Sequence, residues 1–115
     1  MTRGLVFKTM LTEIVANHKL DADGKPAGGQ TTGIGFSIVW QDGPLGRGPD
    51  RLPPNGAFVE TVIAAALDRI KFYNDTEFRC RENSLAITHL EEALHWLQHR
   101  TAEREARGVE GTHEV

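Results

Sequence analysis

Arginines near the C-terminus are the residues of this sequence best suited to bind an anion. Arg100 and Arg104 are four residues apart, which places them one turn apart on one face of a helix, and Arg107 follows. A guanidinium is a planar fork of donors that fits phosphate oxygens and stacks on nucleobases. The same segment is rich in Glu, and a helix C-terminus carries negative partial charge. Salt bridges and compensation of the helix dipole are therefore the alternative roles.

A second set of residues resembles a metal-binding pattern. Glu92 and His95 are three residues apart, and His95 and His99 are four apart, so they share helix faces. Di-metal carboxylate bundles use such Glu-x-x-His pairs, but from two helices together with two further Glu. The preceding helical segment offers only Glu60 and Asp68. We therefore predict a solvated polar face and no metal.

No motif for hydrolytic or phosphotransfer chemistry is present. The sequence contains no G-x-S-x-G, no H-E-x-x-H and no P-loop. The Gly-rich residues 43–51, which include Arg47, could fold backbone N–H groups around an anion or form a plain connecting loop. We predict a binding protein and not an enzyme.

Composition restricts the class of protein further. The 115 residues suffice for one domain, and the hydrophobic fraction of 39% suffices for a small core. A net charge of −3 argues against binding of DNA or RNA polymers. Lys8 and Glu13 interrupt the apolar start, and no run approaches the roughly 20 apolar residues of a membrane helix, so we expect a cytoplasmic protein. The single cysteine, Cys80, excludes an internal disulfide and is expected to be partly buried.

The first half of the chain has β-like patterning. Residues 34–40 alternate apolar and small or polar side chains, which predicts a half-buried strand, and residues 5–15 predict one or two more. Residues 21–29 have strong turn chemistry and are expected to form a mobile loop. Residues 42–56 are expected to form a long irregular segment without helix or strand.

The second half predicts two helices. Asn55 is a plausible N-cap for the first helix. The second begins within residues 78–81 and ends at Arg107, with Gly108 at the C′ position. We therefore predict an α+β fold, in which a small antiparallel sheet precedes an antiparallel two-helix hairpin. We expect one domain over residues 1–115, with a β-rich part at 1–54, the hairpin at 55–107 and a tail at 108–115.

The predicted helix lengths also favour an oligomer. About 27 residues at 1.5 Å each make the second helix roughly 40 Å long, whereas the first has about 18 residues. The end of the longer helix therefore overhangs, and a small hairpin buries little apolar surface. Association of copies would cover the surplus, including Trp96.

The C-terminal half resembles a known family. Residues 81–101, RENSLAITHLEEALHWLQHRT, and 107–113, RGVEGTH, resemble the C-terminal hairpin of phage anti-defence sponge proteins. They are most similar to the Thoeris anti-defence sponges of type one, whose hairpin is shared with the anti-CBASS sponges of type two. Residues 35–44, GFSIVWQDGP, and the PNG before the first helix also look like the type one family. The resemblance covers roughly residues 33–113.

This resemblance implies a function. Such proteins are encoded by phages or prophages and act in the cytoplasm of the infected bacterium. They bind and sequester cyclic ADP-ribose isomers made by bacterial TIR-domain immune proteins, without cleaving them. Some members also hold cyclic oligonucleotides at separate sites. The resemblance further implies a homo-oligomer, a dimer or a higher assembly such as a hexamer, with no cofactor.

The resemblance also assigns site residues. The family's purine-stacking aromatic falls on Phe72 or Tyr73, and its polar contact early in the second helix falls on Asn83. Its paired phosphate-binding arginines fall on Arg100 and Arg104. The candidate ligand-binding residues are then Arg100, Arg104, Asn83, Tyr73, Phe72, the loop residue Arg47, and Thr101 at the end of the matched motif.

Helix geometry restricts how these residues can form one site. Asn83 and Arg100 are 17 residues apart, which is roughly 25 Å along one helix. A mononucleotide-sized ligand cannot touch both in one chain, so a shared site would lie between subunits whose hairpins run antiparallel. Two other functions stay open. An enzyme that cleaves the signal would have to use His89, His95 or His113, and a protein–protein adaptor would use the exposed hairpin as its docking face.

Overall fold

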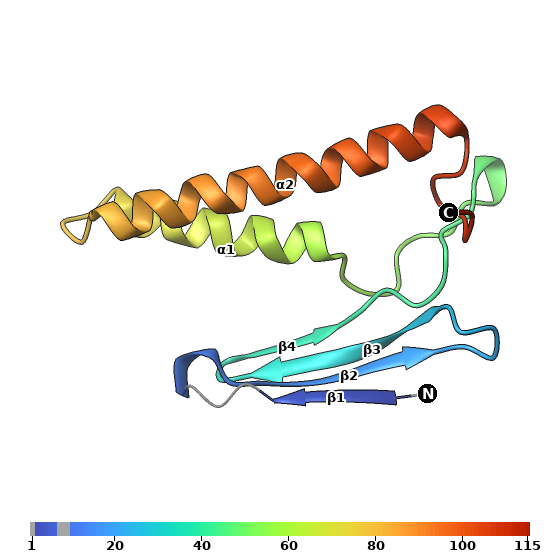
Figure 1. The fold of residues 1–115 in the computed structure, drawn as a ribbon, viewed down its shortest axis with the longest axis horizontal. Helices are drawn as coiled ribbons and strands as arrows, with labels where there is room; N and C mark the ends of the chain where they lie inside the picture. The colour runs from blue at the N-terminus through green and yellow to red at the C-terminus, as the bar shows by residue number, and fades with distance from the viewer. Residues whose placement is uncertain (1, 7–9) are drawn as a thin grey trace. The chain divides into compact units, whose positions relative to one another are not determined.

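The protein is described here from a computed structural model, which describes residues 2–6 and 10–115. The chain forms two compact units, residues 1–58 with 111–115, and residues 59–110. Figure 1 shows a sheet in the first unit and a pair of helices in the second. The predicted α+β class and the order of sheet and hairpin are confirmed.

The sheet is an antiparallel meander of four strands. It has the order β1 (Thr2–Val6), β2 (Ile14–Leu20), β3 (Pro26–Gly33) and β4 (Phe36–Val39). Ala16, Thr31 and Ile38 lie opposite one another across β2, β3 and β4, so their side chains share a face. Ala16 and Thr31 are buried, and the Thr31 hydroxyl accepts a hydrogen bond from Trp40 Nε1 at 2.8 Å. This row is the core of the sheet.

The turn between β2 and β3 is shorter than expected. The Asp21 carboxylate accepts hydrogen bonds from the backbone N–H groups of Asp23 and Lys25, at 2.9 and 3.0 Å, and closes the turn. Strand β3 already begins at Pro26. The predicted loop over residues 21–29 is confirmed for 21–25 and was wrong for 26–29, because pairing with β2, and contacts with Trp40 and Asp42, override the turn propensity of the glycines.

The segment between the sheet and the helices is held by side chains. Asn55 Oδ1 accepts from the backbone N–H of Asp42 at 2.8 Å, and Asn55 Nδ2 donates to the Asp42 carbonyl at 2.9 Å. Its role as a helix N-cap was therefore a wrong prediction, since α1 begins four residues later, at Val59. The segment is irregular apart from the 3₁₀ turn η2 (Gly48–Asp50), which was not predicted; the chain has a further 3₁₀ turn, η1, at Met10–Thr12.

The helical unit is an antiparallel hairpin of α1 (Val59–Asn74) and α2 (Arg81–Arg107). Leu67 is its most buried apolar side chain, with 8% of its surface exposed. The apolar residues of α2 that face α1 are only half-buried. Neither helix, among the residues that the structure describes, is long and apolar enough to cross a membrane.

Both ends of α2 are capped. Cys80 Sγ accepts a hydrogen bond from the Asn83 N–H at 3.4 Å, so this cysteine is an exposed N-cap and not the partly buried residue expected. At the other end Gly108 adopts φ 75°. The Gly108 N–H donates to the Glu105 carbonyl, and the Val109 N–H donates to the Arg104 carbonyl. The predicted span of α2 and its C′ glycine are confirmed.

Candidate ligand-binding site

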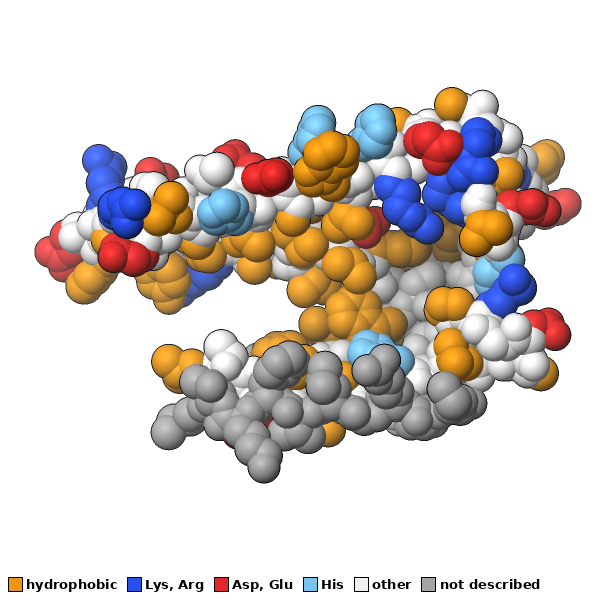
Figure 2. All heavy atoms as spheres, viewed as in Figure 1, with side chains coloured by type: hydrophobic (Ala, Val, Ile, Leu, Met, Phe, Trp, Pro, Cys, Tyr) orange, Lys and Arg blue, Asp and Glu red, His pale blue; other side chains and the backbone are white. Residues whose placement is uncertain are grey.

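The C-terminal end of α2 presents two arginines one turn apart. Arg100 is exposed and makes no hydrogen bond or ion pair with any residue that the structure describes. Arg104 is half-buried, and its Nη2 donates to the Val109 carbonyl at 3.0 Å. Figure 2 shows Lys and Arg side chains gathered over this end of α2, with Asp and Glu side chains between them. Arg100 is therefore the guanidinium best placed to bind an anion here.

Two neighbours of these arginines have their polar groups engaged within α2. Arg107 forms an ion pair with Glu103 one turn earlier, so for Arg107 the salt-bridge role is the one observed. The Thr101 hydroxyl donates to the Leu97 carbonyl at 3.2 Å and is half-buried. Thr101 can still offer its second lone pair to a ligand.

The last turns of α1 present an exposed aromatic pair. Phe72 and Tyr73 have 52% and 43% of their surface exposed, and their ring centroids lie 5.7 Å apart at an angle of 56°. Tyr73 therefore does not lie inside the core. Sequence reasoning missed a third member of this cluster, Arg69, whose guanidinium carbon lies 4.8 Å from the Phe72 centroid and 4.9 Å from the Tyr73 centroid. The spacing of three and four residues on one helix could have predicted it.

Asn83 lies in the first turn of α2, close to the connection between the helices. Its Nδ2 donates to the Phe78 carbonyl at 3.3 Å, which leaves the amide oxygen able to accept. Because α2 is unbroken from Arg81 to Arg107, it separates Asn83 from Arg100 by roughly 25 Å. One chain therefore cannot bring these two residues to one mononucleotide.

Arg47 belongs to the sheet unit, in the loop just before η2. It is exposed and has extended backbone angles, φ −134° and ψ 155°. The loop is tied down on both sides: the Gly46 N–H donates to the Gly111 carbonyl at 2.7 Å, and the Leu52 N–H donates to the Leu45 carbonyl at 2.7 Å. Arg47 is thus carried by a braced loop.

The histidines of α2 surround a tryptophan. The rings of His95 and His99 pack edge-on against Trp96, with centroids 5.4 and 6.0 Å from its ring. Trp96 itself has 61% of its surface exposed. Within the described residues, no three His, Cys, Asp or Glu side chains gather where they could hold a metal ion.

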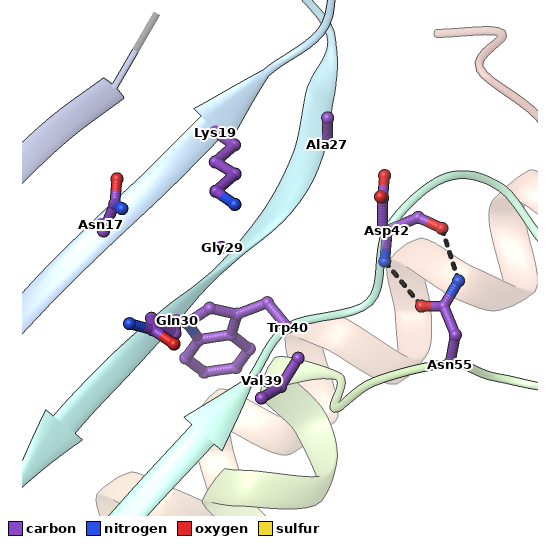
Figure 3. Close-up of a pocket in the computed structure, with 9 residues that line it drawn as sticks. All are labelled: Asn17, Lys19, Ala27, Gly29, Gln30, Val39, Trp40, Asp42 and Asn55. Atoms are coloured by element: carbon purple, nitrogen blue, oxygen red, sulfur yellow. Dashed lines mark hydrogen bonds between the residues drawn. The ribbon is translucent and has the colours of Figure 1, made fainter.

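The sheet unit has a cavity of about 380 Å³ that no sequence pattern predicted (Figure 3). Lys19 and Trp40 lie on its wall, together with Asp42 and Asn55, which are hydrogen-bonded to each other. It is lined by Asn17, Lys19, Ala27, Gly29, Gln30, Val39, Trp40, Asp42 and Asn55. None of the predicted ligand-binding residues lines it.

The described structure is a small antiparallel sheet followed by a helical hairpin. The hairpin exposes arginines and aromatic rings, which are groups that can bind a small nucleotide. Residues 34–102, more than half of the chain, match the family described as Acb2/Tad1, hairpin domain. The chain belongs to this family, which confirms the resemblance found in its sequence. It is also 60% identical over 60 residues to "Thoeris anti-defense 1" of Bacillus phage SBSphiJ7. That alignment covers 52% of this chain and 42% of the relative, so the chain matches less than half of the relative's length.

Proposed function

We propose that this chain is a phage anti-defence sponge, which binds a cyclic ADP-ribose isomer made by a TIR-domain immune protein and withholds it without cleaving it. The relative named for anti-Thoeris activity supports this target. The protein would act in the cytoplasm of the infected bacterium. Cyclic oligonucleotides are further candidate ligands, whereas DNA and RNA polymers are not expected.

The unpaired guanidinium of Arg100, one turn from Arg104, carries the proposal. An arginine that is held on a rigid helix and has no carboxylate partner among the described residues is available to a ligand anion. Arg104, one turn later, adds a second guanidinium that also donates to the Val109 carbonyl, so the two side chains can together face a pyrophosphate. Each charge-assisted hydrogen bond is worth about 1.5–3 kcal/mol. Exposed rings at Phe72 and Tyr73 supply the surface on which a purine stacks.

The distance along α2 supports a site shared between copies. Because Asn83 and Arg100 cannot reach one small ligand within a chain, we place the base at the start of one α2 and the phosphates at the end of another. Such a site requires a homo-oligomer, a dimer or larger. A symmetric pair of antiparallel hairpins would form two equivalent sites.

Cleavage of the signal is the alternative function. It needs a base that is held by an orienting group, as in other general acid–base sites. The His95 ring instead packs against Trp96, and His89 and His95 make no hydrogen bond with a carboxylate in the described part of the chain. For His89 and His95, the absence of an orienting carboxylate among those residues favours binding over hydrolysis, whereas the charge of His113 acts on the Asp21 carboxylate of the sheet unit.

One experiment separates the functions. The purified protein is incubated with the product of a Thoeris TIR enzyme, filtered to remove free ligand and then heated to release what it holds. A sponge returns the intact cyclic ADP-ribose isomer, and the heated extract again activates the Thoeris effector. Recovery of a linear product would show that the protein is an enzyme. If no ligand is recovered, the protein–protein adaptor is the remaining function. Arg100→Ala/Arg104→Ala protein is the matched control and should return little ligand.

A further inference from the structure

Arg69 is unusual among the arginines of the hairpin. Its guanidinium carbon lies within 5 Å of two ring centroids, and its Nη2 donates to the Tyr73 hydroxyl at 3.4 Å. It has no ion pair with any described residue. The neighbouring Lys71, in contrast, pairs with Glu91 on α2 at 3.4 Å. Arg69 thus interacts with two aromatic rings and not with an acidic side chain of the described residues.

The geometry explains what this contact does to the rings. A cation above an aromatic face is attracted to it, and a guanidinium that lies against two rings restricts both. Phe72 and Tyr73 are consecutive, so their side chains leave the helix about 100° apart. Arg69 precedes them by three and four residues, which places its long side chain over both. Without it, each ring would be free to change rotamer, since both are about half exposed.

We propose that Arg69 is a positioning residue for base recognition: it holds Phe72 and Tyr73 in the orientation that receives a purine and does not itself touch the ligand. The inference rests on the proposed function, because it assumes that a nucleotide stacks on this pair. In this arrangement the guanidinium lies against one face of an aromatic ring and the purine stacks on the other face. A ring that Arg69 already holds in place loses less conformational entropy when the base binds than a freely rotating ring would.

The test is a double-mutant cycle on the affinity for the cyclic ADP-ribose isomer that a Thoeris TIR enzyme releases. Arg69→Ala should weaken binding by roughly threefold to tenfold, and Arg69→Lys should restore part of the loss, because an ammonium also binds ring faces but lacks the planar fork. In a Phe72→Ala/Tyr73→Ala background that retains measurable affinity, Arg69→Ala should have almost no further effect. Arg79→Ala, on the connection between the helices, is the control for loss of a positive charge.

Each other result overturns the inference in a distinct way. An undiminished effect of Arg69→Ala in the double-alanine background would mean that the guanidinium contacts the ligand directly. Unchanged affinity together with a lower melting temperature would mean a purely structural role. If the unmodified protein does not bind the isomer at all, the proposed function fails, and the positioning role fails with it. Salt dependence adds a second readout: it should be the same for Arg69→Ala as for the control Arg79→Ala, since each loses one positive charge and neither residue contacts the phosphates.

Discussion

The backbone N–H of Gly46 donates a hydrogen bond to the carbonyl of Gly111 at 2.7 Å, which ties the C-terminal tail to the loop that carries Arg47 (Figure 1). Gly111 has φ 81°, and a Cβ at this position would overlap the Gly46 carbonyl. Arg51 Nη1 donates to the same carbonyl at 3.3 Å. Residues far apart in sequence therefore fix this loop, at a position where only glycine fits.

Gly111→Ala should lower the free energy of unfolding by about 2 kcal/mol or more. A left-handed backbone costs an alanine about 1 kcal/mol, and the overlap with Gly46 adds to it. Gly108→Ala is the matched control, because Gly108 has a similar φ of 75° but its Cβ would meet nothing within 4 Å. Gly108→Ala should therefore lower the free energy of unfolding only by the strain of a left-handed alanine. Equal urea midpoints for the two variants would contradict the close approach.

Arg100→Ala and Arg104→Ala should each weaken ligand binding by about 1.5–3 kcal/mol in calorimetry. They should differ in stability. Arg100 has no hydrogen bond in the described structure, whereas Arg104 holds the Val109 carbonyl. Arg104→Ala should therefore also lower the free energy of unfolding by about 0.5–1.5 kcal/mol, and Arg100→Ala should leave it unchanged. Unchanged affinity in both variants would refute the phosphate assignment.

Tyr73→Ala should lose roughly 1–3 kcal/mol of binding free energy if Tyr73 is the stacking platform. Tyr73→Phe should bind nearly as well as the unmodified protein, since stacking needs the ring and the hydroxyl makes only the long contact to Arg69. Phe72→Ala would then be the milder change. The reverse order of the two alanine variants moves the platform to Phe72, and full affinity in both removes stacking here from the mechanism.

The protein should be an oligomer under all conditions in which it binds ligand. Within residues 11–115, whose burial the structure describes, Ala16 and Leu67 are the only buried apolar side chains, which is a very small core. Trp96→Glu should reduce the mass measured by light scattering, because it places a charge on an exposed apolar surface of α2. Gln98→Glu adds the same charge about 200° around the helix and should have less effect. A stable monomer that binds ligand would exclude the shared site.

The turn at Asp21 should respond to acid. Hydrogen bonding, chiefly from the Lys25 N–H, holds the Asp21 pKa below its usual value of 3.8, with desolvation opposing and His113 adding a smaller favourable charge. A lowered pKa contributes stability above pH 3.8 that is lost as the pH falls through the folded value. The stability difference between the unmodified protein and Asp21→Ala should therefore shrink below pH 3.8. Hydrogen exchange of the Lys25 amide measures the stability of this turn as a function of pH. The control Asp23→Ala should change that stability little at any pH.

The sequence by itself determined the features that depend on local periodicity and chemical type. Gly108 at the C′ position predicted the end of α2 at Arg107, and the start was placed within residues 78–81, because helix caps are local. Alternation over residues 34–40 predicted β4, which the structure has at Phe36–Val39. The family motifs identified the hairpin, and the match over residues 34–102 confirms that identification.

Only the tertiary structure decided which partner each side chain has. The turn-rich glycines at 28 and 29 lie in a strand because β2 pairs with Gly29 on one side and the Trp40 N–H donates to the Gly29 carbonyl on the other. Asn55 binds Asp42 where a helix cap was expected. The arginines also differ in their partners, although the sequence alone does not distinguish them because each carries one positive charge. Arg107 pairs with Glu103, Arg69 covers two rings, and Arg100 makes no such contact with the described residues. Spacing restricts which groups can meet, but packing selects the rotamer and therefore the contact that forms.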